Sequence, residues 1–180
     1  MSTELDIKKE LRASMNGILS ARMREAGMPF KLIFGVELPR LQSIAKDFPQ
    51  DAELAKRLWS QSIREMRLLA IMLMPPETFT FKVAEEWGKT MLTAEEAQIM
   101  AMMLLPKTSA CKEVCMAWIE EGKSLTATSA CLCLRHLIIR GIKLNEDERL
   151  FVEDCIKKML PGANLHLRKA IQVLEAAIEE

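Results

Sequence analysis

The chain of 180 residues carries 25 basic and 25 acidic side chains, which gives a formal net charge of zero at pH 7. This balance excludes a strong overall field toward nucleic acid or anionic membranes, so any basic surface has to arise from folding. The five cysteines are an odd number, and the N-terminus is polar and lacks an apolar run. Both features predict a cytoplasmic protein with reduced thiols, and the length predicts one domain over residues 1–180.

Helix-forming residues dominate, and no stretch shows the alternating, β-branched pattern of a strand. In the first half, Asn16 is expected to bend the first helical region, Pro39 to open the second and Asp51 to cap the third. The four helical regions predicted here cover residues 3–26, 39–48, 52–59 and 63–74.

The fourth region, I-R-E-M-R-L-L-A-I-M-L-M, is the most apolar part of the chain. Its charges, Arg64, Glu65 and Arg67, all lie in the first turn, and every later residue is apolar. A helix without a solvated face is buried on all sides in a soluble protein. The run is well short of the ~20 apolar residues that cross a bilayer, so we predict a central core helix and no membrane association.

Six further helices are predicted in the second half, over residues 79–91, 94–105, 108–121, 124–140, 146–159 and 163–179. Thr93 with Glu96 forms a capping box, Asn145 precedes an acidic first turn, and Gly122 and Gly141 stand where helices end. Two helices recur every ~35–40 residues with short joints, which is the spacing of HEAT-type pairs. The sequence therefore predicts an all-α fold, a HEAT-like α-α superhelix formed as a right-handed solenoid of antiparallel helix pairs.

Cys111 and Cys115 share one helix face, and Cys131 and Cys133 lie on the next predicted helix. Four thiolates from two helices can bind zinc, but structural zinc sites usually use C-x2-C knuckles in turns. Buried cysteines also fill space between helices as small apolar residues, which is the interpretation we favour. No phosphate-binding glycine loop is present, and we expect no metal and no cofactor.

In a solenoid of paired helices, every second helix lines the concave face. If the helix over residues 63–74 is one of these, the others are 94–105, 124–140 and 163–179. Basic side chains on such helices can follow a phosphate backbone, although they can equally be solvated charges or partners of nearby glutamates. The basic residues placed there are Arg64, Arg67, Arg135, Arg140, Arg168 and Lys169.

Three segments resemble the AlkD-like DNA alkylation repair superfamily. F-G-V-E-L-P-R-L-Q-S-I-A-K-D-F (34–48) is similar to its F-G-V-x-x-P-x-L-R-x-I-A-K signature. L-A-K-R-L-W-S-Q-S-I-R-E-M-R-L-L-A (54–70) is similar to L-A-x-x-L-W-x-S-x-x-H-E-x-R-x-L-A, and L-R-K-A-I-Q-V-L (167–174) to the helix F-I-R-K-A-I-x-W-x-L. The resemblance implies a curved HEAT-like solenoid whose concave, basic face holds duplex DNA.

The residues that this superfamily uses for base excision are not matched. The aromatic of its W-D-x-x-D-type segment falls at about Ala94, its carboxylate at about Gln98, and a late tryptophan at Val173. The family's fifth-repeat arginine falls within residues 126–129, T-A-T-S, which hold no base. Excision of a cationic alkylated purine develops positive charge on the sugar, which a carboxylate stabilises, and aromatic faces favour the cationic base. An amide and an alanine provide neither.

These observations favour a protein that binds duplex DNA through phosphate contacts without excising bases. An alternative is a DNA glycosylase for 3- or 7-methylpurines that uses Glu95 or Glu96, although each residue turns a helical side chain by ~100° away from the family position. A further alternative is a protein-binding α-solenoid scaffold, which the zero net charge favours.

Overall fold

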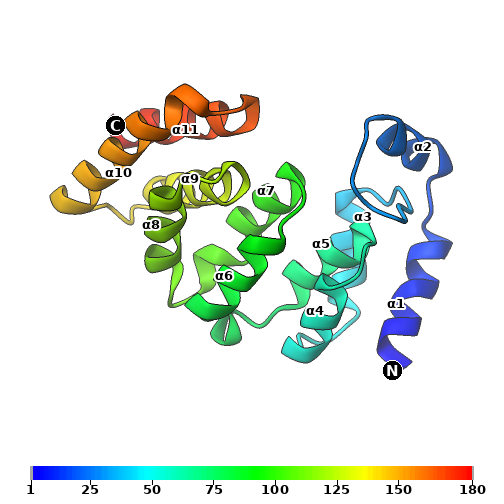
Figure 1. The fold of residues 1–180 in the computed structure, drawn as a ribbon. Coiled ribbons are helices and arrows are strands. Elements are labelled where there is room, and N and C mark those ends of the chain that lie inside the picture. The colour runs from blue at the N-terminus through cyan, green and yellow to red at the C-terminus, as the bar shows by residue number, and fades with distance from the viewer. Residues whose placement is uncertain (1, 180) are drawn as a thin grey trace. The chain divides into compact units, whose positions relative to one another are not determined.

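The computed structural model describes residues 2–179, and their secondary structure is helical (Figure 1). Eleven α-helices and three short 3₁₀ helices are present in this range. It contains no β-strand, only an isolated parallel bridge between Leu32 and Ile63. The predicted all-α fold is confirmed. Contacts group the chain into two compact units, one up to Thr78 and one from Phe79 onward. The expectation of one domain over residues 1–180 stays a prediction.

The first unit contains five α-helices: α1 (Ser2–Ala13), α2 (Gly17–Glu25), α3 (Leu38–Lys46), α4 (Ala52–Trp59) and α5 (Arg64–Leu73). The first predicted region is broken and not merely bent, because α1 ends at Ala13 and the backbone of Asn16 is extended before α2 begins. The Asn16 side chain then accepts a hydrogen bond from the Leu19 N–H and caps α2. The expected cap of α4 is confirmed, since Asp51 accepts from the Leu54 N–H at 2.6 Å.

Helix α5 forms the centre of the first unit and packs against α3 and α4. All of its residues except Met72 are buried. The prediction of a central core helix is confirmed, and burial extends to the charged first turn. A short 3₁₀ helix, Pro76–Thr78, follows and ends the unit. None of the helices within residues 2–179 is both long and apolar enough to span a lipid bilayer.

The second unit contains six α-helices: α6 (Phe81–Thr90), α7 (Ala94–Met103), α8 (Cys111–Glu121), α9 (Ser124–Ile139), α10 (Glu146–Met159) and α11 (Leu165–Glu179). The 3₁₀ helices Leu105–Lys107 and Leu160–Gly162 follow α7 and α10. Helices α7, α9 and α11 pack in one row, and α6, α8 and α10 form another. Helix α8 packs on α9 and joins the rows, so alternate helices form two layers, as expected for HEAT-type stacking.

Helices α9 and α11 run parallel in their row. At their start, the Asn164 side chain donates to the Ser124 hydroxyl at 2.5 Å. At their end, Ile139 of α9 and Ile178 of α11 line the same pocket. Equivalent helices of successive repeats are therefore side by side and aligned.

The predicted helix boundaries in this unit follow from local hydrogen bonds. Thr93 and Glu96 form the expected capping box at the start of α7, and Asn145 forms another at the start of α10. Gly122 and Gly141 have φ angles of 66° and 86°, the left-handed conformation that ends α8 and the turn after α9.

Candidate nucleic-acid interface

Four of the six basic residues expected to contact DNA are exposed in the second unit. They lie near the end of α9 and near the start of α11: Arg135, Arg140, Arg168 and Lys169. The guanidinium of Arg168 donates to the Ala163 carbonyl at 2.8 Å, and that of Arg140 is 3.5 Å from the His136 ring. Within residues 2–179, no acidic side chain pairs with any of the four. Their positive charge is therefore available to a phosphate.

The spacing of these groups follows from the helix register. Because α9 and α11 start side by side, Arg135 lies about 10 Å further along its helix than Arg168 does along α11. Neighbouring helix axes are about 8–10 Å apart. The basic side chains of α9 (Arg135 and Arg140) and those of α11 (Arg168 and Lys169) are therefore separate contact points and not one dense patch.

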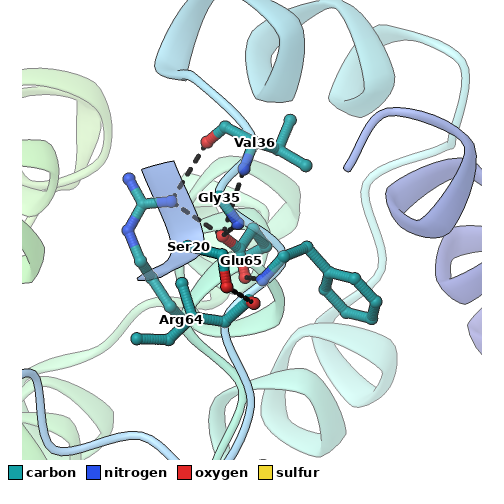
Figure 2. Close-up of polar contacts among 7 residues, drawn as sticks. Ser20, Gly35, Val36, Arg64 and Glu65 are labelled. Carbon is teal, nitrogen blue, oxygen red and sulfur yellow. Dashed lines mark hydrogen bonds and ion pairs between the residues drawn. The ribbon is translucent and has the colours of Figure 1, made fainter. Parts of the chain in front are cut away.

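Arg64 and Glu65 form a buried polar network at the start of α5 (Figure 2). The Glu65 carboxylate accepts hydrogen bonds from the backbone N–H groups of Phe34, Gly35 and Val36 at 3.0, 2.9 and 3.3 Å. The Arg64 guanidinium donates to Glu65 Oε1 at 2.8 Å and to the Val36 carbonyl at 3.0 Å. Both residues are almost inaccessible, with 2% and 0% of their surface exposed. The network fixes the loop between α2 and α3 to the central helix.

Gly35 lets this loop pass close to the start of α2. Its φ of 73° is left-handed, and a Cβ there would lie 2.6 Å from the backbone nitrogen of Ser20. Beside it, the Asn16 N–H donates to the Phe34 carbonyl at 3.0 Å, and the Ser20 hydroxyl donates to the Ile33 carbonyl at 2.6 Å. The loop therefore requires glycine at this position.

Arg67 is buried in a different contact. Its guanidinium donates to the Trp59 carbonyl at 2.6 Å and lies over the Trp59 ring, 3.9 Å from the centroid. Only 4% of the residue is exposed. A stacked and hydrogen-bonded guanidinium of this kind stabilises the packing of α4 on α5.

Because Arg64 and Arg67 are buried, a DNA phosphate cannot reach their side chains. Both arginines were expected on the concave face, because charged residues are seldom buried. Here each guanidinium has protein acceptors, which compensate for the loss of water. Both arginines have a structural role in the first unit.

The candidate excision residues lie around the start of α7. Gln98 is exposed and Ala94 is half-buried, and on α11 Val173 is 36% exposed. The Glu96 carboxylate is buried and accepts from the N–H groups of Leu92 and Thr93 at 2.6 and 3.2 Å. Glu96 is thus committed to capping the helix.

Glu95 is half-buried and has an interaction partner of its own within the described residues. The stretch matched to the family's fifth-repeat arginine, residues 126–129, is buried in α9. Its hydroxyls bond locally, Thr128 to the Ser124 carbonyl and Thr126 to the Lys123 carbonyl. The buried Ser129 hydroxyl has no hydrogen-bond partner among the residues that the structure describes.

Three thiol groups converge between α8 and α9. The Sγ atoms of Cys111, Cys115 and Cys133 all lie within 4.8 Å of one another. Hydrogen bonds from Cys115 and Cys133 lower the pKa of Cys111, and the reciprocal contacts raise the pKa of those two partners. Cys131 is outside the cluster, and burial raises its pKa to about 12. Among residues 2–179, these three thiols form the one group with metal-ligand spacing.

The two layers of alternate helices in the second unit are typical of all-α proteins of the HEAT-like repeat class. A family model described as DNA alkylation repair enzyme matches residues 7–174, and the chain belongs to this family. A solved structure is similar, with a TM-score of 0.81 and 16% identity over 96% of this chain and 74% of the other. That protein is described as related to the HEAT-like repeat DNA glycosylases, with affinity for branched DNA structures. The likeness confirms the predicted HEAT-like fold. No curated protein matches the chain.

Two features of these sites are absent from the sequence predictions. The role of Glu65 has a signal, because an acidic residue beside an arginine in an apolar helix needs buried partners. The backbone N–H groups that it binds lie about 30 residues earlier and could not be identified from spacing. The cluster of three thiols also has a signal. Residues two apart on a helix, such as Cys131 and Cys133, point about 200° apart, so only one of them could lie with Cys111 and Cys115.

Proposed function

We propose that this protein binds duplex DNA without sequence preference and does not excise bases. The observation that carries the proposal is the set of four exposed basic side chains, without an acidic partner among residues 2–179, on the parallel helices α9 and α11 of a HEAT-like fold. The proposed contact residues are Arg135, Arg140, Arg168 and Lys169.

Family membership supports contact with DNA, since the matching family is one of DNA alkylation repair enzymes. The structural relative is described as having affinity for branched DNA structures, which supports a backbone-directed mode of binding. Phosphate contacts from arginine and lysine carry no sequence information and need only a regular array of negative charges. With zero net charge on the chain, binding depends on these local groups and not on a long-range field.

The chemistry around α7 supports the absence of excision. A carboxylate has to face the sugar to stabilise the charge that develops there. At the family's position this chain has the exposed amide of Gln98, and the neighbouring Glu96 carboxylate is occupied by backbone N–H groups. Glu95 is the one remaining acidic candidate from the sequence.

Binding is tested by fluorescence anisotropy with a labelled duplex and a labelled four-way junction at low salt. We expect the double substitution Arg135→Gln with Arg168→Gln to weaken duplex binding by at least tenfold, because two phosphate contacts are lost. The matched control is Lys157→Gln with Lys158→Gln, which removes two exposed charges from α10 in the other layer. Equal loss in both variants, or no binding by the wild type, would contradict the proposal and favour the protein-binding alternative.

Excision is tested separately with duplex DNA that contains 3- and 7-methylpurines, using excess enzyme and a single turnover. We expect no free methylated base. Release of base by the wild type that disappears in Glu95→Gln would show a glycosylase and overturn this part of the proposal.

A further inference from the structure

The convergence of three thiols from two helices is unexplained by the proposed function. Cys111 and Cys115 lie one turn apart on α8, and Cys133 projects from α9, the helix on which α8 packs. All three are buried, with 7%, 0% and 0% of their surface exposed. The Sγ atoms of Cys111 and Cys133 are 3.4 Å apart, and all three lie within 4.8 Å of one another.

These separations fit coordination of one metal ion better than the alternatives. A zinc–thiolate bond of about 2.3 Å places sulfur atoms about 3.8–4.0 Å apart around a tetrahedral or trigonal ion. The Cys111–Cys133 separation of 3.4 Å is slightly shorter than this value, and the limit of 4.8 Å on all three separations includes it. A disulfide has an S–S bond of about 2.05 Å and joins two sulfurs, so it would leave the third thiol without a role. Cysteines that only fill space between helices have no reason to direct three sulfurs to one point.

We propose that Cys111, Cys115 and Cys133 form a binding site for a thiophilic divalent cation of the Zn²⁺ type. Thiolates are soft ligands that select such ions over Mg²⁺ and Ca²⁺. On binding, three S–H bonds break, three protons pass to solvent and three metal–sulfur bonds form, with no change of oxidation state.

A divalent ion suits the buried position better than a monovalent one. Three thiolates with a 2+ ion carry a net charge of −1, whereas a 1+ ion would leave −2 in the interior, where uncompensated charge is costly. Among the described His, Cys, Asp and Glu side chains, no fourth one joins the three thiols at this spacing, so the proposed site takes a water molecule as its fourth ligand. Cys111 is the most exposed of the three and is the first residue of α8, where backbone N–H groups favour an anion. Exchange of the ion is therefore expected on the Cys111 side.

The site would clamp α8 onto α9 and so join the two layers of the second unit. The site includes none of the basic side chains proposed to contact DNA, so its existence does not depend on DNA binding. Its expected effect is stabilisation of the folded chain, because the unfolded chain does not hold three thiolates together.

The test uses the full chain, reduced with a phosphine and freed of metal by a chelator, and titrated with Cd²⁺ as the probe. We expect a thiolate-to-cadmium charge-transfer band that saturates at one equivalent and is removed by competing Zn²⁺. Cys133→Ala is expected to weaken Cd²⁺ binding by at least 100-fold. Cys131→Ala is the matched control, because it removes a buried thiol from the opposite side of the same helix. Absence of the band at one equivalent, or equal affinity in the two variants, would overturn the proposal.

A measurement on the wild type alone covers the case in which Cys133→Ala does not fold. X-ray absorption at the cadmium edge counts the sulfur neighbours of the bound ion, and three are expected. Two or fewer sulfur neighbours would overturn the proposal irrespective of any variant.

Discussion

At the scale of single residues, Glu65 organises the first unit. One carboxylate satisfies three consecutive backbone N–H groups and the Arg64 guanidinium, and no part of the side chain is exposed. Buried donors that lose their acceptor retain the full cost of desolvation. The loop from Phe34 to Val36 therefore depends on this side chain.

We predict that Glu65→Gln lowers the free energy of unfolding by about 3–5 kcal/mol, because it leaves a buried guanidinium without its counter-charge. An amide also directs an N–H group toward backbone donors. Urea unfolding followed by circular dichroism measures the change. Glu53→Gln is the matched control, since Glu53 forms an exposed pair with Lys56 and should contribute less than about 1 kcal/mol. Equal effects of the two substitutions would contradict the role of Glu65.

A second prediction separates backbone strain from close packing at glycine. Gly27 and Gly35 have similar left-handed φ angles of 79° and 73°, but only Gly35 has backbone atoms where a Cβ would go. Alanine at Gly27 should cost about 1–2 kcal/mol for the conformation alone. Gly35→Ala should cost about 1–3 kcal/mol more, because the Asn16 and Ser20 backbone has to move. Equal losses in thermal or urea unfolding would show that the close approach is unimportant.

Part of the candidate site was predictable from the sequence at this scale. The sequence prediction included the exposed Arg135 and Arg168 together with the buried Arg64 and Arg67. The charge of an arginine does not reveal whether a hydrogen-bond acceptor lies next to it in the folded protein. Such acceptors come from distant segments, as the Val36 carbonyl does for Arg64. Exposure was therefore the information that the sequence lacked.

At the scale of elements, the helices were predictable where capping residues mark their ends. The range predicted for α10, residues 146–159, agrees with the structure because Asn145 caps it. Region 3–26 was predicted as one bent helix but forms two helices. Asn16 caps the second of them with an extended backbone, and the sequence alone does not show whether an asparagine bends a helix or starts a new one. The spacing of helices in the sequence does not show which side chains touch across two neighbouring helices. It did not reveal, for example, that Cys133 and not Cys131 contacts the thiols of α8.

The link between α8 and α10 gives a prediction on pH. The Lys112 ammonium donates to both carboxylate oxygens of Glu148 at about 3 Å, and Asn145 adds a backbone N–H. These contacts, the one from Lys112 above all, lower the pKa of Glu148 below its ordinary value of 4.5. A lowered pKa means that the carboxylate stabilises the folded state above pH 4.5 and that this contribution is lost as the pH falls through the folded-state value.

We therefore expect the stability difference between wild type and Glu148→Gln to be constant from about pH 6 to 7 and to shrink as the pH falls below 4.5. Urea unfolding at a series of pH values measures this difference. Glu113→Gln, an exchange on α8 at a residue with no ion pair among the described side chains, is the control for the loss of a carboxylate. A difference that grows at low pH would contradict the assignment.

At the scale of the whole molecule, a chain with no net charge belongs to a family of DNA alkylation repair enzymes. Binding without a long-range field requires a few basic groups that are exposed and lack acidic partners. The second unit offers four such groups on two parallel helices. We predict weak, local and strongly salt-dependent association with DNA.

The most direct test is the slope of log K against log salt concentration for binding of the wild type to a labelled duplex. Four phosphate contacts predict a slope of about −3 to −4, or roughly a 100-fold loss of affinity between 50 and 200 mM salt. Arg135→Gln with Arg168→Gln should reduce the slope by about 2, whereas Lys157→Gln with Lys158→Gln should leave it unchanged. A slope near zero for the wild type, or the same slope in both double variants, would contradict the account.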